Sequence, residues 1–255
     1  MARQMVKRVV LSTLTLLVAS FVHGQDYRHE TVQIDSLITA DVEMESYIAL
    51  YQDSLNRHMS DVLAVSKEFM GIGRPESNLS RFLADITFEI GKTWAAERDL
   101  PMPDMALINN GGIRSVLHKG NITRRSIYEI IPFENTLTFV TIDGNTLSEI
   151  FSHIAFRGGE GISNATLTIK QGKAVDMTVN GNVIDPTKSY TIVTLDYLAN
   201  GGDSFKMMEK GQIYDTGKCF RDIVIDYLAN HKNSRRRIAA PTNRRITLIG
   251  ETHEN

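Results

Sequence analysis

The sequence predicts an α+β (α/β) fold in which a mixed β-sheet is flanked by helices. From Met102 onward, short apolar runs alternate with Gly, Asn and Asp, and amphipathic helical segments lie between several of these runs. Some neighbouring runs are joined by hairpin-type turns and others by longer crossovers that contain a helix. Hairpins give antiparallel neighbours and crossovers give parallel ones, so one sheet is expected to contain both kinds of pairing.

Composition places the chain among ordinary globular proteins. Of its 255 residues, 42% are hydrophobic and 23% are charged, which is enough to bury a substantial core. The formal net charge of -2 gives no electrostatic reason to expect nucleic acid as a partner. The basic run Arg235 to Arg237 is interpreted as a solvated loop near the C-terminus.

The N-terminus has the pattern of a secretory signal peptide over residues 1–24. Arg3, Lys7 and Arg8 precede an uncharged run from Val9 to Val22, and permissive residues end at Gly24. A permanent anchor is the less favoured alternative, because this run is shorter than the ~20 residues that span a bilayer. The sequence therefore predicts export to the periplasm or cell surface, with no stable membrane anchor.

Two helical regions follow. Residues 25–70 are expected to form a helical, linker-like segment, because helical spacing continues there with few turn formers. The main domain is assigned to residues 71–255. It opens with a helix whose start is marked by Pro75 and Ser77, and whose buried face is predicted to be formed by Leu79, Phe82, Leu83, Ile86, Ile90 and Trp94.

The remaining elements follow in alternation. Strands are predicted at "MALI", "TLTFVTI", "ATLTIKQGKAVDMTV" and "SYTIVTL", with "QGK" and "NGN" as hairpin-type turns. Helices are predicted at "RRSIYEII", "GNTLSEIFSHIA" and "GKCFRDIVIDYLANH".

Several kinds of catalytic centre are not supported by the sequence. The seven His residues are scattered and show none of the spacings that bind metal ions. No G-x-S-x-G nucleophile motif is present. The glycine patterns of Walker and dinucleotide-binding loops are missing as well. No catalytic residue and no metal ligand is therefore assigned to this chain.

Two glycine-rich loops of the same kind remain. "NNGGIR" (109–114) follows one predicted strand and "LANGGDSF" (198–205) follows another, and each combines Asn, paired Gly and a charged residue. Paired Gly lets the backbone approach a ligand closely, although a tight turn is the alternative interpretation. Together with "IPFEN" (131–135), these loops indicate one pocket.

These motifs and their order resemble the C-terminal, substrate-binding domain of the 5'-nucleotidase family, which includes UDP-sugar hydrolases. The resemblance runs from about Arg74 to the C-terminus, and it predicts a 5'-nucleotidase C-terminal domain-like fold. "RPESNLSRFLAD" is similar to the family's opening helix, whose usual form has Gly where this chain has Ser80.

The resemblance also implies roles for individual residues. Phe133 and Tyr197 fall on the family's base-stacking aromatics, Asn109 on a hydrogen-bond partner of the base, Asp203 on the acceptor for ribose hydroxyls, and Arg114 on a phosphate ligand. The rest of the predicted site comprises loop residues and a second phosphate-facing Arg: Gly111, Gly112, Asn200, Gly202 and Arg74, with Arg81 as a rival to Arg74.

Other interpretations of single residues stay open at this point. Phe133 and Tyr197 could belong to the core, and Asp203 could cap the segment that follows or fix a turn.

In the family, hydrolysis is carried out by a separate N-terminal metallophosphatase domain that holds two metal ions. The residues between the signal peptide and Arg74 carry none of those ligands, so divalent metals are expected only in a partner metallophosphatase. The favoured hypothesis is therefore the nucleotide-binding half of a split, secreted 5'-nucleotidase that acts in nucleotide catabolism. The alternatives are a stand-alone periplasmic nucleoside- or nucleotide-binding protein and a degenerate relative that has lost the ligand.

Overall fold

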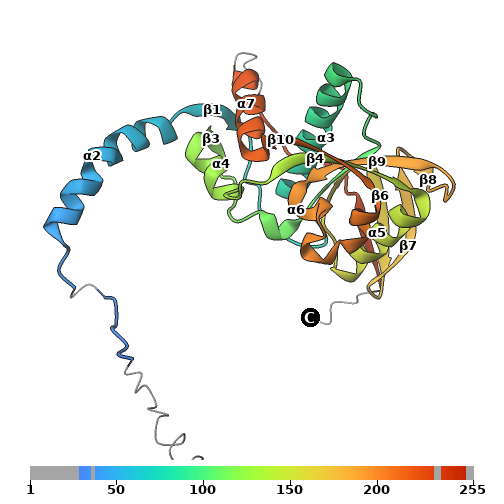
Figure 1. Cartoon of the computed structure of the whole chain (residues 1–255), viewed down its shortest axis with the longest axis horizontal. Coiled ribbons are helices and arrows are strands. Elements are labelled where there is room, and N and C mark those ends of the chain that lie inside the picture. Colours follow the sequence, from blue (N-terminus) through green and yellow to red (C-terminus); the bar gives the residue numbers. More distant parts are fainter. Residues whose placement is uncertain (1–28, 36–37, 233–236, 251–255) are drawn as a thin grey trace, which may run out of the picture. The chain divides into compact units, whose positions relative to one another are not determined.

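The computed structural model describes residues 29–35, 38–232 and 237–250. The signal peptide predicted over residues 1–24 lies outside the described residues. The chain divides into two units, residues 1–49 and 50–255, and the sheets and helices that form the site belong to the second (Figure 1). Within the described ranges, no helix is both long and apolar enough to cross a membrane.

Helix α2 (Val42–Met59) occupies part of the predicted helical segment. Asp41 begins the helix, because its side chain accepts two backbone N–H groups of the first turn, and none of the helix side chains is buried. The prediction of helix up to residue 70 is wrong beyond this point. Residues Val62–Ser66 form strand β1, which pairs antiparallel with β3 (Gly120–Thr123). This long-range pairing buries Leu63, and helical spacing within a short window carries no information about it.

The central sheet contains five strands in the order β10–β4–β9–β2–β5. Strands β2 and β9 pair in parallel, and the other neighbouring pairs are antiparallel, so the predicted mixed sheet is confirmed. The strands of this sheet are β2 (Met105–Ile108), β4 (Thr136–Asp143), β5 (Gly161–Ser163), β9 (Ser189–Leu195) and β10 (Gln212–Cys219).

Both faces of the central sheet are covered. In β2, Ala106 and Ile108 join one apolar core while Met105 and Leu107 join the other, because successive side chains of a strand point to opposite faces. The first core is closed by helices α3 (Asn78–Arg98), α4 (Arg124–Ile130) and α7 (Phe220–Lys232). Helix α5 (Gly144–Phe156) and a second sheet close the other.

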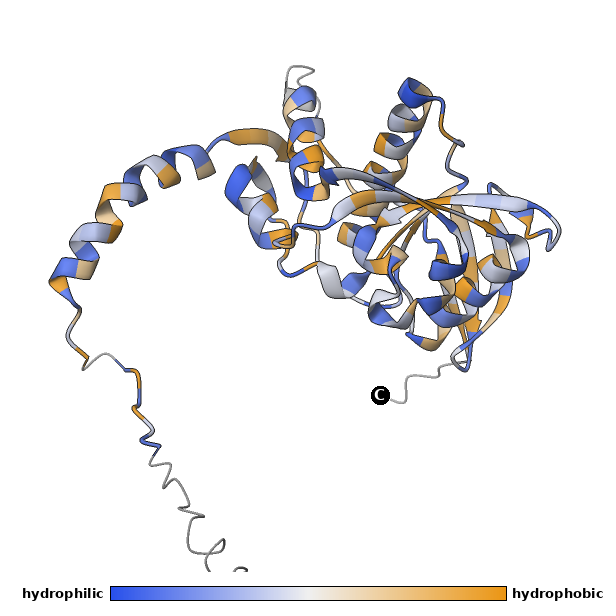
Figure 2. Cartoon of the chain, viewed as in Figure 1, coloured by the Kyte–Doolittle hydropathy of each residue, from blue (hydrophilic) through white to orange (hydrophobic). Residues whose placement is uncertain are grey.

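Helix α3 begins where the sequence predicts. Ser77 accepts the N–H of Ser80, and the Ser80 hydroxyl accepts the N–H of Ser77, so two donors of the first turn are satisfied. Figure 2 shows apolar and polar positions interleaved along the helix. The predicted apolar face is buried at Leu79, Phe82, Leu83, Ile86 and Ile90, and Trp94 packs against the same core.

The second sheet has four strands in the order β11–β6–β7–β8. Its two hairpins lie at the predicted turns, where Gln171 and Gly172, and then Asn180 and Gly181, adopt positive φ angles between 49° and 73°. Positive φ at both central residues suits the twist of two-residue hairpins. The strands are β6 (Ala165–Lys170), β7 (Lys173–Val179), β8 (Asn182–Val183) and β11 (Ile246–Ile249).

Candidate functional site

Three motifs that the sequence singled out meet at one edge of the central sheet. Strands β2 and β9 are parallel neighbours, so the loops that follow them, from Asn109 and from Asp196, leave the same edge. Strand β4 runs antiparallel to β9 with Leu137 opposite Leu195, so the segment before β4, which carries Phe133, ends at that edge as well. The strand order therefore gathers segments that are far apart in the sequence.

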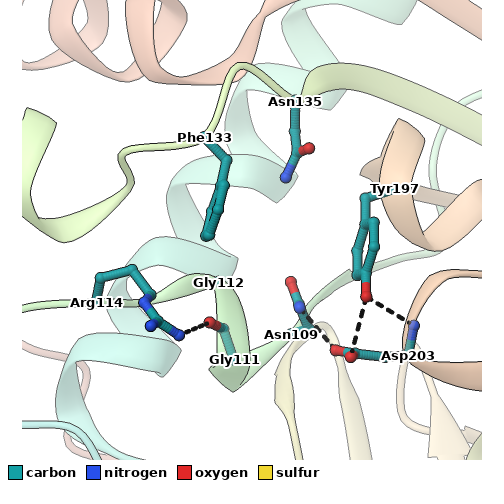
Figure 3. Close-up of a pocket in the computed structure, with 8 residues that line it drawn as sticks. All are labelled: Asn109, Gly111, Gly112, Arg114, Phe133, Asn135, Tyr197 and Asp203. Atoms are coloured by element: carbon teal, nitrogen blue, oxygen red, sulfur yellow. Dashed lines mark hydrogen bonds between the residues drawn. The ribbon is translucent and has the colours of Figure 1, made fainter. Parts of the chain in front are cut away.

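These segments surround a cavity of about 380 Å³ (Figure 3), a size that suits a small organic ligand. Every residue of its lining except Asn135 is among the site residues predicted from the sequence, and Asn135 itself lies in the predicted motif "IPFEN". Of the residues predicted for the site, Arg74, Asn200 and Gly202 are not part of the lining. The lining consists of Asn109, Gly111, Gly112, Arg114, Phe133, Asn135, Tyr197 and Asp203.

Two aromatic side chains point into the cavity from different elements. Phe133 precedes β4, and Tyr197 belongs to the short helix α6 (Asp196–Ala199). Figure 3 shows the two rings on opposite sides of the hollow with open space between them. Phe133 is 50% exposed and Tyr197 is 44% exposed, so neither ring is a core residue. Two ring faces separated by a gap can hold a flat aromatic ligand.

Gly202 leaves room for the Tyr197 ring without lining the cavity. A Cβ atom on Gly202 would overlap the Tyr197 carbonyl oxygen and would lie 2.7 Å from two carbons of the Tyr197 ring. The loop can pass behind the tyrosine only because this side chain is absent. Gly202 thus supports the site from outside its lining.

Asn109, Asp203 and the Tyr197 hydroxyl form the polar floor of the cavity. The Asn109 Nδ2 donates to Asp203 Oδ2 at 2.7 Å, and the Tyr197 hydroxyl donates to Asp203 Oδ1 at 3.2 Å. The same hydroxyl accepts the Asp203 backbone N–H at 3.1 Å. Asn109 is buried, and its Oδ1 has no hydrogen-bond partner within the described part of the chain. A buried acceptor without a partner is costly unless a ligand or water supplies a donor.

A second layer of charge lies behind this floor. Arg157 pairs with Asp203, with 3.0 Å between Nη2 and Oδ2, and with Glu160, with 2.7 Å between Nε and Oε1. Glu160 is fully buried, and its Oε2 accepts the backbone N–H of Asn110 at 2.5 Å. The loops after β2 and β9 are therefore tied to the end of helix α5.

Arg114 is an exposed residue of the cavity lining. Its backbone N–H donates to the Ile130 carbonyl at 2.8 Å, while its exposed guanidinium donates from Nη1 to the Gly111 carbonyl at 3.3 Å. No carboxylate is paired with it in the part of the chain that the structure describes. An exposed guanidinium that is not paired with a carboxylate can donate hydrogen bonds to an anionic group of a ligand.

The structure places Arg74 and Asn200 away from the cavity. The Arg74 guanidinium donates to the carbonyls of Arg157 and Gly159 and lies 3.5 Å from the Glu160 carboxylate. Asn200 ends helix α6, where its Nδ2 donates to the Asp196 carbonyl at 2.9 Å. Both side chains are engaged in hydrogen bonds to backbone carbonyls, and neither belongs to the cavity lining.

The segment that carries Phe133 is anchored from behind by Arg221. The Arg221 Nη1 donates to the Pro132 carbonyl at 2.7 Å, and its Nη2 lies 3.4 Å from the Glu134 carboxylate. Its guanidinium also stacks over the Tyr128 ring at 4.1 Å. Because Arg221 is buried, these contacts hold the segment in one place.

The site holds no cluster of metal ligands. Across the described ranges, no group of three or more His, Cys, Asp or Glu side chains is placed to hold a metal ion. The residues of the cavity do not fit a divalent metal centre either, because Asp203 is its one carboxylate.

Sequence reasoning missed Asn135, Arg157 and Glu160. The segment "RGGEG" (157–161) is a third loop with paired glycines and charged residues, but it contains no Asn and follows a helix instead of a strand. A Glu between glycines gave no reason to expect full burial. The role of Glu160 is apparent only in the folded structure, where this loop lies beside "NNGGIR" and binds Asn110.

Comparison with known proteins gives a consistent result. The family model described as "5'-nucleotidase, C-terminal domain" matches residues 62–210. Protein UshA of Escherichia coli K12 is 28% identical over 120 residues, which cover 45% of this chain and 22% of UshA. Endonuclease YhcR of Bacillus subtilis is 31% identical over 205 residues, which cover 72% of this chain and 16% of YhcR.

Solved structures agree with the sequence comparisons. The crystal structure of a 5'-nucleotidase precursor from Thermus thermophilus matches with a TM-score of 0.68 and 26% identity, over 82% of this chain and 43% of that one. The chain thus spans less than half the length of these relatives. Since the family model covers more than half of the chain, the chain belongs to the family of 5'-nucleotidase C-terminal domains.

Proposed function

We propose that the cavity binds the nucleoside part of a nucleotide, with the base between Phe133 and Tyr197. The observation that carries this proposal is the pair of half-exposed rings on opposite sides of one cavity. Exposing two large aromatic faces to water is unfavourable, and a base inserted between them removes both faces from water. Each base–aromatic stack contributes about 1–3 kcal/mol and tolerates any base.

The polar groups of the cavity suit the rest of a nucleotide. The Oδ1 of Asn109 has no hydrogen-bond donor within the described part of the protein. The edge of a nucleobase carries N–H groups that can donate to this oxygen. The Asp203 carboxylate lines the cavity and accepts ribose hydroxyls. Arg114, an exposed residue of the lining, pairs with phosphate oxygens.

In this proposal the chain is the substrate-binding half of a split, exported 5'-nucleotidase. A separate metallophosphatase subunit supplies the divalent metals and the hydrolytic chemistry. The family membership supports the proposal, as does the absence of a metal-ligand cluster from the described ranges. The signal-like pattern over residues 1–24 supports export to the periplasm or cell surface.

Phosphate release from AMP tests the split arrangement. The chain alone, with Mg²⁺ or Mn²⁺ added, is expected to release none. Addition of a metallophosphatase encoded beside its gene is expected to give release that EDTA stops and that Tyr197→Ala in this chain strongly reduces. EDTA-sensitive release by the chain alone contradicts the proposal. Tight AMP binding that no such subunit converts to release favours a stand-alone binding protein instead.

A further inference from the structure

A partly buried network of ion pairs extends from the cavity into the protein. Arg157 lies in the turn that ends helix α5. Its guanidinium forms ion pairs with two carboxylates, those of Asp203 and Glu160. Asp203 lies on the cavity side and Glu160 on the core side. The side chains of Arg157 and Asp203 are each 22% exposed, whereas that of Glu160 is 0% exposed. The guanidinium fork can make both contacts at once because it is planar and rigid.

Asp203 is held at two points by the same helix end. The Arg157 Nη2 contacts its carboxylate, and the Arg157 Nη1 donates to its backbone carbonyl at 3.4 Å. The His153 Nε2, one turn earlier, lies 2.9 Å from that carbonyl. These contacts matter because the Asp203 backbone has φ 51°, a left-handed conformation that is unfavourable for residues other than glycine.

Glu160 in turn holds the Arg157 guanidinium in place. Its Oε1 accepts from Arg157 and lies 3.5 Å from Arg74, while its Oε2 accepts the Asn110 backbone N–H. A fully buried carboxylate is retained at low cost only when charged partners and N–H donors surround it. Here those partners come from three segments. The adjacent Asn109 donates to the Asp203 oxygen that Arg157 contacts.

We propose that Arg157, backed by Glu160, is a positioning residue that orients the Asp203 carboxylate toward the vicinal hydroxyls of a ribose. This inference rests on the proposed nucleoside binding. Arg157 and Asn109 both engage Oδ2, while Oδ1 contacts only the Tyr197 hydroxyl among the hydrogen bonds of the described residues. Oδ1 therefore keeps acceptor capacity for the ligand. The network sets a preference for ribonucleosides without touching the sugar.

The test compares two ligands that differ only in those hydroxyls. Binding of adenosine and of 2′,3′-dideoxyadenosine is measured by calorimetry for the wild-type chain, Arg157→Gln and Glu160→Gln. The wild type is expected to bind adenosine about tenfold or more tightly than the dideoxy compound, as hydrogen bonds to a carboxylate imply. Arg157→Gln is expected to reduce this ratio to about one or two, while its affinity for the dideoxy compound changes less than about twofold.

Controls separate positioning from a general effect on folding. Arg98→Gln removes an exposed ion pair with Glu97 on helix α3 and is expected to leave both affinities unchanged. Arg157→Lys keeps the charge but cannot bridge both carboxylates, so an intermediate ratio is expected. Glu160→Gln is expected to lower the ratio, and adding it to Arg157→Gln is expected to have little further effect, because the two act as one unit.

The outcomes distinguish this inference from the proposed function. A wild type that binds neither nucleoside overturns the proposed function and the inference with it. A wild type that binds both, with a ribose preference that Arg157→Gln and Arg157→Lys leave intact, overturns the inference alone. An equal loss of affinity for both ligands in these variants also overturns it, since a purely structural defect does not distinguish the two sugars.

Discussion

The Asn109 Nδ2 donates to Asp203 Oδ2 at 2.7 Å, although the two residues are 94 positions apart in the sequence. They follow β2 and β9, which are parallel neighbours in the central sheet. This single contact joins the two glycine-rich loops that the sequence singled out. The Oδ1 of Asn109 is buried and has no hydrogen-bond partner among the described residues.

Gly202 is expected to be indispensable for binding. Gly202→Ala places a methyl group where it overlaps the Tyr197 carbonyl and lies 2.7 Å from the ring, so the ring must move. We expect adenosine affinity, measured by calorimetry, to fall about tenfold or more, which corresponds to the loss of one base stack.

Gly73→Ala is the matched control for this substitution. Gly73 lies outside the cavity lining, and no heavy atom beyond its chain neighbours lies within 4 Å of where its Cβ would be. The variant is expected to bind adenosine within about twofold of the wild type. Equal losses in the two variants contradict the role assigned to Gly202.

Phe133 is expected to contribute to binding and little to stability. Because its ring is 50% exposed, Phe133→Ala removes few packing contacts, and the unfolding midpoint is expected to change little. Loss of one stack is expected to weaken adenosine binding by about 1–3 kcal/mol. Phe69→Ala, which truncates another ring that is 53% exposed and outside the cavity lining, is the control; a similar loss of affinity there argues against stacking.

Arg221 is expected to affect both stability and binding. Arg221→Met keeps apolar volume but leaves the Pro132 carbonyl without its donor, and we expect the free energy of unfolding in urea to fall by about 1–3 kcal/mol. Adenosine affinity is expected to fall as well, because the segment carrying Phe133 loses its anchor.

Arg98→Met serves as the control for Arg221. Arg98 also stacks over an aromatic ring, Trp94, at 3.7 Å, yet it is partly exposed and its side chain pairs only with Glu97 in the described hydrogen bonds. Its replacement is expected to cost well under 1 kcal/mol. If the two variants lose the same stability, the buried carbonyl contact is not what makes Arg221 important.

Asp143 is expected to make stability depend on pH at the acidic end. It caps helix α5, and the backbone N–H of Thr146, at 2.7 Å from its Oδ1, lowers the pKa of this carboxyl below its ordinary value. The ionised Asp143 carboxylate therefore stabilises the fold at pH values above the ordinary carboxyl pKa. This stabilisation is lost as the pH falls through the lower pKa of the folded state.

Urea unfolding of the wild type and Asp143→Asn at about pH 6 and about pH 3 measures this contribution. Asn can also cap a helix but does not titrate. We expect Asp143→Asn to be less stable than the wild type at the higher pH and the difference to shrink at the lower one. Asp185, whose pKa is also lowered, by the side chain of Thr187, is present in both proteins. A difference that does not change with pH rules out this role for Asp143.

Local pattern was sufficient for much of the fold and of the candidate site. Helix α3, the mixed sheet and both hairpins follow from apolar spacing and turn residues within short windows. For the cavity, the paired glycines indicated which loops meet, whereas the roles of Phe133, Tyr197 and Asp203 were implied by the resemblance to the 5'-nucleotidase family. Strand β1 could not be predicted from local pattern, because it pairs with β3, whose residues are more than fifty positions away in the sequence.

The contacts of Arg157, Glu160 and Arg74 behind the cavity could not be predicted from the sequence either, because they also join residues that are far apart in the chain. Arg157 and Asp203 are 46 residues apart, and Arg74 and Glu160 are 86 apart. The family resemblance places Arg74 at the site, but its guanidinium binds the carbonyls of Arg157 and Gly159 and lies near the Glu160 carboxylate instead. Which of several arginines faces a ligand depends on such tertiary partners, and a sequence pattern carries no information about them.

The most direct test of nucleobase binding is calorimetric titration of the purified chain with adenosine, beside its Tyr197→Ala variant. We predict one binding site per chain in the wild type and at least about a tenfold loss of affinity in the variant, because one of the two stacking faces is removed. Absence of binding to the wild type, or equal affinity in the two proteins, would contradict the claim that the cavity between Phe133 and Tyr197 holds a nucleobase.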